Sequence, residues 1–177
     1  IVINQFMTGV KNAIANKASS ISKADAKTAM TAFIQEKTHE YEAALKINQA
    51  ASNKYLAKIQ QQSGIKTLSN GLYYKVDQTG SGDKPKATDT VKVEYTGYLP
   101  NGTVFDSSKQ HGGSATFKLN QVIPGWTQAL QQMPVGSTWD VYIAPKLAYG
   151  AQAPASIGPN QALHFKISLL EIEQPSS

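Results

Sequence analysis

The sequence predicts an α+β protein in which N-terminal helices, one of them long, precede an antiparallel sheet wrapped around a short helix. All eight prolines lie at or after Pro85, and twelve of the thirteen glycines lie at or after Gly64. The N-terminal part is instead rich in Ala, Lys and Gln and favours helix, whereas turn residues later recur at the spacing of short strands. We therefore expect a helical region over residues 1–64 and a strand-rich domain over residues 65–177.

A first helix is predicted close to the N-terminus. One apolar residue follows another at the i, i+3, i+4, i+7 spacing of a single helix face, at Ile3, Phe6, Met7, Val10 and Ile14. Two serines at residues 19 and 20 interrupt this pattern. The sequence therefore indicates that a second, separate helix begins after them.

The second helix is predicted to begin with a capping box and to be unusually long. Ser22 stands three residues before Asp25, a spacing in which the two ends of the motif satisfy free backbone N–H groups. The pattern continues to about residue 62, which corresponds to a length on the order of 60 Å. Its apolar stripe becomes sparse toward the C-terminal end, so we expect a stalk that is exposed to water over much of its length.

Two helices alone bury too little apolar surface to be stable, so their shared apolar face requires a partner. Two partners are compatible with the sequence, the strand-rich domain or the same face of a second copy of the chain. The length of the stalk favours the second copy, and we expect a homodimer formed through residues 1–62. The face consists of Phe6, Met7, Val10, Met30, Phe33 and Ile34.

The second part of the chain is predicted to form five or six strands and one short helix. Asn101–Gly102 between two apolar runs is a strong signal for a tight hairpin. A helical stretch over residues 126–133 follows the turn at Pro124–Gly125. The predicted strands cover residues 72–76, 91–99, 104–105, 115–119, 138–144 and 162–172, with a loop over 151–161 before the last of them.

Composition and motif content exclude several classes of function. The chain has no Cys, so neither a disulfide nor a thiolate metal site is expected. His39, His111 and His164 stand in unrelated contexts, and no nucleophile elbow or phosphate-binding glycine loop is present. We therefore expect no metal and no cofactor.

The positive charge does not indicate nucleic-acid binding. The net charge is +5, but all seventeen basic residues are Lys, scattered singly along the chain, and none is Arg, the residue that recognises phosphate and guanine by paired hydrogen bonds. No stretch approaches eighteen consecutive apolar residues, so no membrane span is expected either.

Apolar side chains next to predicted turns are the candidates for a binding site. Such residues normally form the core of a β-domain. Trp126, however, lies at the start of the predicted short helix, where a large aromatic ring provides the floor of a pocket. The full candidate set is Tyr95, Phe105, Asp106, Val122, Ile123, Trp126, Tyr149, Ile157 and Phe165.

Six short motifs follow one another in the second part of the chain. They are Val93-Glu94-Tyr95-Thr96-Gly97, the Asn101-Gly102 turn with Val104-Phe105-Asp106-Ser107-Ser108, Val122-Ile123-Pro124-Gly125-Trp126, Met133-Pro134-Val135-Gly136, Leu147-Ala148-Tyr149-Gly150 and Leu163-His164-Phe165. Together they resemble the FKBP-type peptidyl-prolyl cis-trans isomerases over roughly residues 68–173. Each string is weak alone, whereas all six in family order are specific. The preceding helical stalk resembles the Mip-like and FkpA-like branch of that family.

The resemblance implies a half-open antiparallel sheet around a short helix and an enzyme of class EC 5.2.1.8 that binds proline-containing peptides and unfolded proteins. Trp126 would form the floor beneath the prolyl ring, Asp106 would lie at the rim facing the twisting amide, and Tyr149 would donate to a substrate carbonyl. Ile157 would lie in the loop above the site. The walls would be Tyr95, Phe105, Val122, Ile123 and Phe165.

The branch also implies a homodimer exported to the periplasm or cell surface of a Gram-negative bacterium. Macrolides such as rapamycin are expected as inhibitors. Many family members carry an aromatic wall where this chain has Ala115, two residues before Phe117, so a more open pocket and weaker macrolide binding are expected here. Ala153 lies in the loop over residues 151–161, at a position where better-known members carry other residues. The substrate preference set by this loop is therefore expected to differ from theirs. The alternative function is a holdase chaperone in which isomerisation is incidental.

Overall fold

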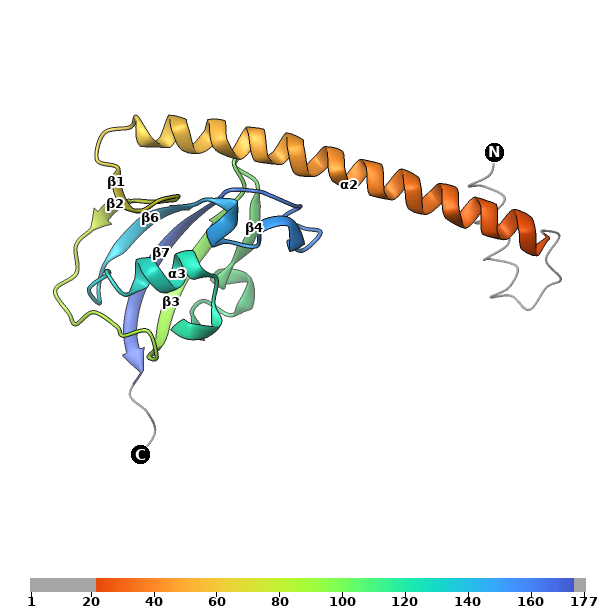
Figure 1. Ribbon diagram of the computed structural model, residues 1–177. Helices are drawn as coiled ribbons and strands as arrows, with labels where there is room; N and C mark the ends of the chain where they lie inside the picture. Colours follow the sequence, from red (N-terminus) through yellow and green to blue (C-terminus); the bar gives the residue numbers. More distant parts are fainter. Residues whose placement is uncertain (1–21, 174–177) are drawn as a thin grey trace. The chain divides into compact units, whose positions relative to one another are not determined.

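The computed structural model describes residues 22–173, which form one long helix, a seven-stranded sheet and short helical segments (Figure 1). The predicted first helix and the residues Phe6, Met7 and Val10 lie outside the described part of the chain. The α-helices are α2 (Lys23–Gln60) and α3 (Pro124–Leu130). The strands are β1 (Lys66–Ser69), β2 (Leu72–Gln78), β3 (Thr90–Tyr98), β4 (Val104–Ser107), β5 (Ala115–Lys118), β6 (Thr138–Ile143) and β7 (Leu163–Glu173).

Helix α2 begins with the predicted capping box. The Ser22 hydroxyl accepts a hydrogen bond from the Asp25 amide at 3.1 Å and donates to the Asp25 carboxylate at 2.7 Å. The first bond satisfies a backbone N–H that the first turn of a helix leaves without an intrahelical partner, and the second joins the two side chains. The helix ends at Gln60, two residues before the predicted end.

By its contacts the chain divides into two compact units, residues 1–44 and residues 45–177. The last turns of α2, from Leu45 to Gln60, therefore belong with the sheet, although the sequence places the boundary after residue 64. Within the first unit, the side chains of Met30 and Ile34 are 42% and 55% exposed. The assignment of residues 1–64 to dimerisation stays a prediction.

All strand pairs of the sheet are antiparallel, and the strand order is β1-β2-β6-β7-β3-β4, with β5 also pairing with β3. The predicted Asn101–Gly102 turn connects β3 to β4, with Gly102 at a φ of 87°. Strand β1 is absent from the sequence prediction because three of its four residues, Lys66, Thr67 and Ser69, are polar and it lies at the edge of the sheet.

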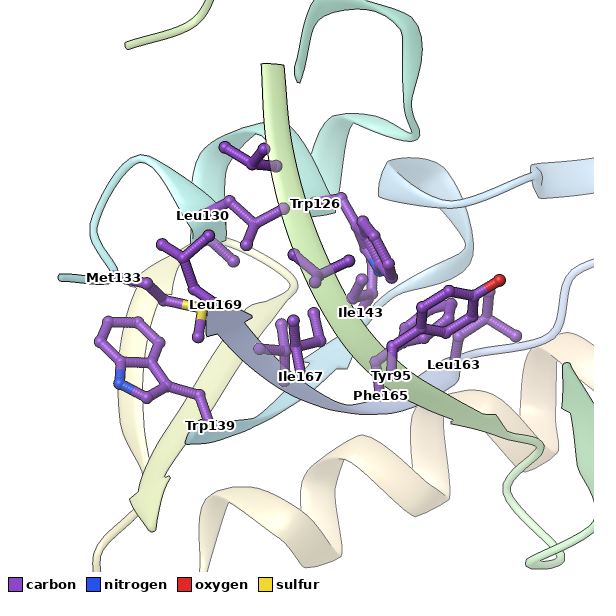
Figure 2. Packing of buried hydrophobic residues seen from close by; sticks show 14 of the residues in the cluster. Tyr95, Trp126, Leu130, Met133, Trp139, Ile143, Leu163, Phe165, Ile167 and Leu169 are labelled. Atoms are coloured by element: carbon purple, nitrogen blue, oxygen red, sulfur yellow. The ribbon is translucent and has the colours of Figure 1, made fainter. Parts of the chain in front are cut away.

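The two faces of the sheet bury different helices, because successive side chains of a strand point to opposite faces. Val141 and Ile143 of β6 belong to the main core, which also contains Trp126 and Leu130 of α3 (Figure 2). Tyr142, between them in the sequence, belongs to a second cluster formed with the end of α2. This second cluster consists of Leu56, Ile59, Tyr73, Tyr142, Ala144 and Ala162.

Helix α3 is the short helix that the sheet curls around, as the sequence predicts. It begins two residues earlier than expected, because Pro124 takes the first helical position, where its missing N–H costs nothing. The predicted α+β class, with an antiparallel half-barrel around a short helix, is confirmed. No helix among residues 22–173 combines the length and apolar character needed to span a membrane.

Candidate active site

A cavity of about 260 Å³ opens between α3, the sheet and the loops after β5 and β6. Ten residues line it, namely Tyr95, Phe105, Asp106, Phe117, Gln121, Val122, Ile123, Trp126, Tyr149 and Phe165. Eight of the nine residues proposed from the sequence are therefore brought together around one space. Their roles in binding or catalysis stay predictions.

Ile157, the ninth residue, does not line this cavity. It is buried in the main core, 7% exposed, in the loop between Tyr149 and β7. The sequence proposal for Ile157 concerns the loop above the site and stays a prediction.

Edge-to-face contacts between aromatic rings form the interior of the cavity. Trp126 is 4% exposed, and its ring lies 5.2 Å from the ring centroid of Phe165 and 5.4 Å from that of Phe117, both nearly perpendicular. Tyr95 meets Trp126 in the same way at 5.2 Å. Such contacts are favourable because the positive edge of one ring meets the negative face of another. They leave Trp126 held from three sides.

Phe117 and Gln121 are the lining residues that the sequence reasoning missed. Phe117 lies on β5 directly opposite Val91 of β3, a register that places its ring beside Tyr95 and Trp126. Ala115, two residues earlier on the same strand, is partly buried against the core and is not among the lining residues. Phe117 thus supplies an aromatic wall on β5, while the expected weaker macrolide binding stays a prediction.

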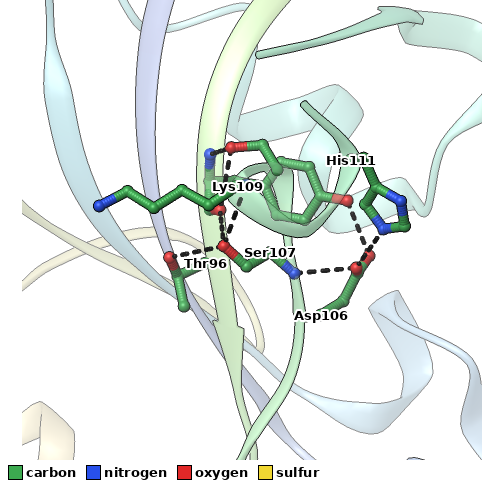
Figure 3. Close-up of polar contacts among 7 residues, drawn as sticks. Thr96, Asp106, Ser107, Lys109 and His111 are labelled. Atoms are coloured by element: carbon green, nitrogen blue, oxygen red, sulfur yellow. Dashed lines mark hydrogen bonds and ion pairs between the residues drawn. The ribbon is translucent and has the colours of Figure 1, made fainter. Parts of the chain in front are cut away.

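Asp106 is the one carboxylate at the cavity among the lining residues, and three donors hold it (Figure 3). The Tyr95 hydroxyl donates to one oxygen at 2.7 Å. The Ser107 amide donates to the other oxygen at 2.8 Å, and the His111 Nε2 lies 2.9 Å from that same oxygen. The carboxylate is therefore fixed in orientation before any ligand binds.

This arrangement determines the charge of Asp106. Burial alone would raise the pKa of its carboxyl, but the hydrogen bonds from Tyr95, His111 and the Ser107 amide outweigh it and hold the pKa below the usual value. Asp106 is accordingly a carboxylate at neutral pH. His111, which the sequence assigns to no site, contacts this group because the short helical segment Ser108–His111 turns back toward β4.

The two tyrosines of the cavity stay neutral. Burial raises the pKa of Tyr95, and its hydrogen bond to Asp106 adds to that effect. Burial and the negative charge of Asp106 likewise raise the pKa of the Tyr149 hydroxyl. Tyr149 is 42% exposed, which leaves this neutral donor accessible at the rim of the cavity.

The cavity has the chemistry of an apolar peptide site with few polar groups. It carries an anchored carboxylate and an accessible phenol, but no cluster of three or more His, Asp or Glu side chains that could hold a metal ion occurs among residues 22–173. Such a combination suits a ligand that presents an apolar ring next to a polar group.

Comparisons with known proteins agree with this geometry. The sequence model described as FKBP-type peptidyl-prolyl cis-trans isomerase matches residues 81–170, and the model of the domain amino terminal to it matches residues 1–76. The FKBP-type peptidyl-prolyl cis-trans isomerase FkpA of Aeromonas hydrophila is 51% identical over 130 residues, covering 73% of this chain and 48% of that protein. The outer membrane protein MIP of Legionella longbeachae is 45% identical over 143 residues, covering 80% and 61%.

A solved structure matches nearly the whole chain. The crystal structure of FkpA from Escherichia coli aligns with a TM-score of 0.78 at 36% identity, covering 96% of this chain and 81% of that one. A peptidyl-prolyl cis-trans isomerase from Pseudomonas syringae aligns with a TM-score of 0.67 at 40% identity, covering 75% and 96%. This chain spans about half to three fifths of the length of the curated relatives it matches first.

Proposed function

This chain belongs to the family of FKBP-type peptidyl-prolyl cis-trans isomerases, and we propose that it accelerates rotation about X–Pro peptide bonds, the reaction of class EC 5.2.1.8. The observation that supports this most directly is the apolar cavity floored by Trp126, with the anchored Asp106 carboxylate at its rim. A prolyl ring fits such a space, since the ring is apolar and the amide beside it is polar.

The physical problem is the barrier to rotation. Amide resonance makes this barrier about 18–20 kcal/mol, so uncatalysed exchange at proline takes tens to hundreds of seconds. No bond forms or breaks, so the reaction needs no nucleophile. In the twisted state the amide loses resonance and charge separation, and an apolar cavity stabilises that state relative to the dipolar planar amide. Each 1.4 kcal/mol of this preference corresponds to about tenfold in rate.

In this proposal the residues of the cavity have different roles in binding the peptide and in stabilising the twisted amide. Trp126 supports the prolyl ring, with walls from Tyr95, Phe105, Val122, Ile123 and Phe165. The Asp106 carboxylate faces the twisting amide, and the Tyr149 hydroxyl donates to a substrate carbonyl. Neither needs to transfer a proton, because rotation about the amide makes and breaks no bond; Asp106 acts as a carboxylate and Tyr149 as a neutral phenol.

The test is exchange kinetics on a Leu-Pro or Phe-Pro peptide, with and without rapamycin. We expect the full chain to accelerate exchange and rapamycin to inhibit it. Asp106→Leu and Tyr149→Ala should each lower kcat/KM by about tenfold, a loss of about 1.4 kcal/mol of transition-state stabilisation. Asp83→Leu makes the same chemical change at an exposed position outside the cavity and should leave kcat/KM unchanged. If kcat/KM were unchanged in both Asp106→Leu and Tyr149→Ala, the proposed role of this cavity in isomerisation would be wrong.

The proposal extends to clients, assembly and location. We propose that the clients are unfolded or partly folded exported proteins, that residues 1–62 join two copies, and that the protein acts in the periplasm or at the outer membrane of a Gram-negative bacterium. The name of the Legionella relative as an outer membrane protein supports that location. A sedimentation mass near the 19.1 kDa of one chain at micromolar concentration would contradict the dimer.

The comparisons do not favour the holdase alternative, because the relatives reported above include proteins named as isomerases. It also predicts a different outcome. A holdase would suppress aggregation equally well in Asp106→Leu, whereas acceleration of proline-limited refolding requires that carboxylate in the function proposed here.

A further inference from the structure

The end of α2 is hydrogen-bonded to the loop that leads from the candidate active site to β7. Ser52 is fully buried, and its hydroxyl donates to the Asn160 carbonyl at 3.0 Å and accepts from the Ala162 amide at 2.7 Å. One helical turn earlier, the Asn48 side-chain amide donates to the Pro159 carbonyl at 2.8 Å. All of these residues belong to the unit of residues 45–177.

The loop residues that Ser52 contacts are connected to residues of the cavity in both directions along the chain. The Asn160 amide donates to the Gly150 carbonyl at 2.8 Å, and Gly150 directly follows Tyr149, which lines the cavity. In the other direction, Ala162 directly precedes β7, whose third residue, Phe165, also lines the cavity. Ser52 therefore contacts the loop between Tyr149 and Phe165, two residues that line the cavity.

The loop has little regular structure of its own to hold this shape. Within its second half, the Ile157 and Gly158 amides both donate to the Pro154 carbonyl at 2.9 Å. Asn160 adopts a φ of 52°, in the left-handed region, which Asn occupies more readily than most residues with a side chain. Gly158 adopts a φ of 81°, and a Cβ added there would be in ordinary van der Waals contact with the Nδ2 of Asn48 at 3.6 Å.

The buried hydroxyl of Ser52 is suited to stabilise this conformation. A buried amide without a partner costs free energy, so the buried Ala162 amide depends on Ser52, which also bonds the partly buried Asn160 carbonyl. Leu56, one helical turn after Ser52, packs against the sheet in the second cluster, which keeps Ser52 in register with the loop.

We propose that Ser52 and Asn48 are positioning residues of the active site, through which α2 holds loop 150–162 and keeps Tyr149 at the cavity. The inference rests on the proposed function, because it assigns the two residues a part in the same reaction. Neither residue lines the cavity, so they act through the loop and not on the peptide.

The experiment uses the full chain and measures kcat and KM on an X–Pro peptide. In the Ser52→Ala protein we expect the loosened loop to adopt its binding conformation only part of the time. The apparent affinity for the peptide is then reduced in proportion to that fraction. We expect KM to rise about threefold to tenfold with kcat within about twofold of wild type. Asn48→Ala removes one partly exposed bond and should raise KM about twofold.

Ile59→Val is the matched control. It weakens the packing of α2 on the sheet without removing a hydrogen bond, so it should lower the unfolding midpoint and leave KM unchanged. If Ser52 only stabilises the fold, Ser52→Ala will behave as this control does. Hydrogen exchange adds a second readout. The Asn160 amide bonds to Gly150 and not to Ser52, so faster exchange there in Ser52→Ala reports loosening of the loop itself.

The outcomes separate the two proposals. An inactive wild-type chain would overturn the proposed function, and exchange at Asn160 would then decide alone whether α2 supports the loop. An active wild type, with KM and Asn160 protection unchanged in both variants, would overturn the positioning role. If Ser52→Ala fails to fold, Asn48→Ala decides in its place, with an unchanged KM counting against the proposal.

Discussion

Gly97, near the end of β3, determines how closely two walls of the cavity approach each other. A Cβ at this position would lie 2.6 Å from the Cζ of Phe105 and 2.8 Å from the Cε1 of Phe165. These two rings line the cavity and meet edge to face with centroids 5.5 Å apart. The absence of a side chain at residue 97 therefore sets the shape of the binding site, without any contact between Gly97 and a ligand.

We expect Gly97→Ala to affect catalysis more than stability. The added methyl would push the ends of two side chains into the cavity, and such overpacking costs about 1–2 kcal/mol of unfolding free energy. The displaced rings should lower kcat/KM by about tenfold. Gly102→Ala is the control, because it adds the same methyl where nothing lies within 4 Å, at a φ of 87° that destabilises by about 1 kcal/mol. Peptide kinetics and urea unfolding decide, and a Gly97→Ala protein with wild-type kcat/KM would refute this view.

Among single residues, the sequence predicts a site residue well when it is close in sequence to other site residues. It does not predict which side chains of a strand point toward the cavity. Val122, Ile123 and Trp126 lie within five residues at the start of the short helix, so the sequence itself indicates that they lie close together. Phe117 reaches the cavity only because β5 pairs with β3 in one particular register, which no local pattern specifies. His111 meets Asp106 for a similar reason, through the turn of a short helical segment.

Among the elements, α3 lies against the sheet at a distance that only glycine permits. A Cβ on Gly125 would lie 2.5 Å from the Cγ2 of Ile143 on β6. Trp126, the next residue, therefore depends on this close approach for its place in the cavity. The Pro124–Gly125 pair thus combines a favourable helix start with close packing.

A double-mutant cycle tests this contact between elements. Gly125→Ala should lower the unfolding free energy by about 1–3 kcal/mol through overpacking, and Ile143→Ala by about 2–4 kcal/mol through a cavity. Because the second change removes the atoms that the first one meets, the double variant should be more stable than the sum predicts by about 1 kcal/mol or more. Urea unfolding followed by tryptophan fluorescence measures all four proteins. Strict additivity would show that α3 adjusts without strain.

The elements also show where sequence patterns lose information. The capping box and the continuous helical pattern predict α2 well, because both are local properties. The sequence assigns Ser52 of that helix no role, yet the residue is fully buried and bonded to the loop. Its burial follows from tertiary packing, and so does the assignment of Leu45–Gln60 to the same unit as the sheet.

For the molecule as a whole, buried ionisable groups define a pH range of stability. Burial would raise the pKa of Asp140, but hydrogen bonding and charge from His164, at 2.6 Å, outweigh it and lower the pKa. Asp106 is shifted in the same direction. A carboxyl whose pKa is lower in the folded state stabilises above its unfolded value, and this contribution is lost as the pH falls through the folded one. Stability should therefore decline below about pH 4.

The alkaline limit follows from tyrosines and has the opposite sign. Burial, with a contribution from Asp140, raises the pKa of Tyr55 to about 12, and burial raises that of Tyr142 as well. Such a group stabilises the fold fully below its unfolded value near 10 and loses this effect as the pH rises toward the folded one. Urea midpoints, read from the fluorescence of Trp126 and Trp139 in the unit of residues 45–177, should fall between pH 10 and 12. Tyr55→Phe removes one titrating group and should make that fall shallower. Parallel curves for the two proteins would contradict the assignment of Tyr55, and a midpoint independent of pH in this interval would contradict the role of the tyrosines altogether.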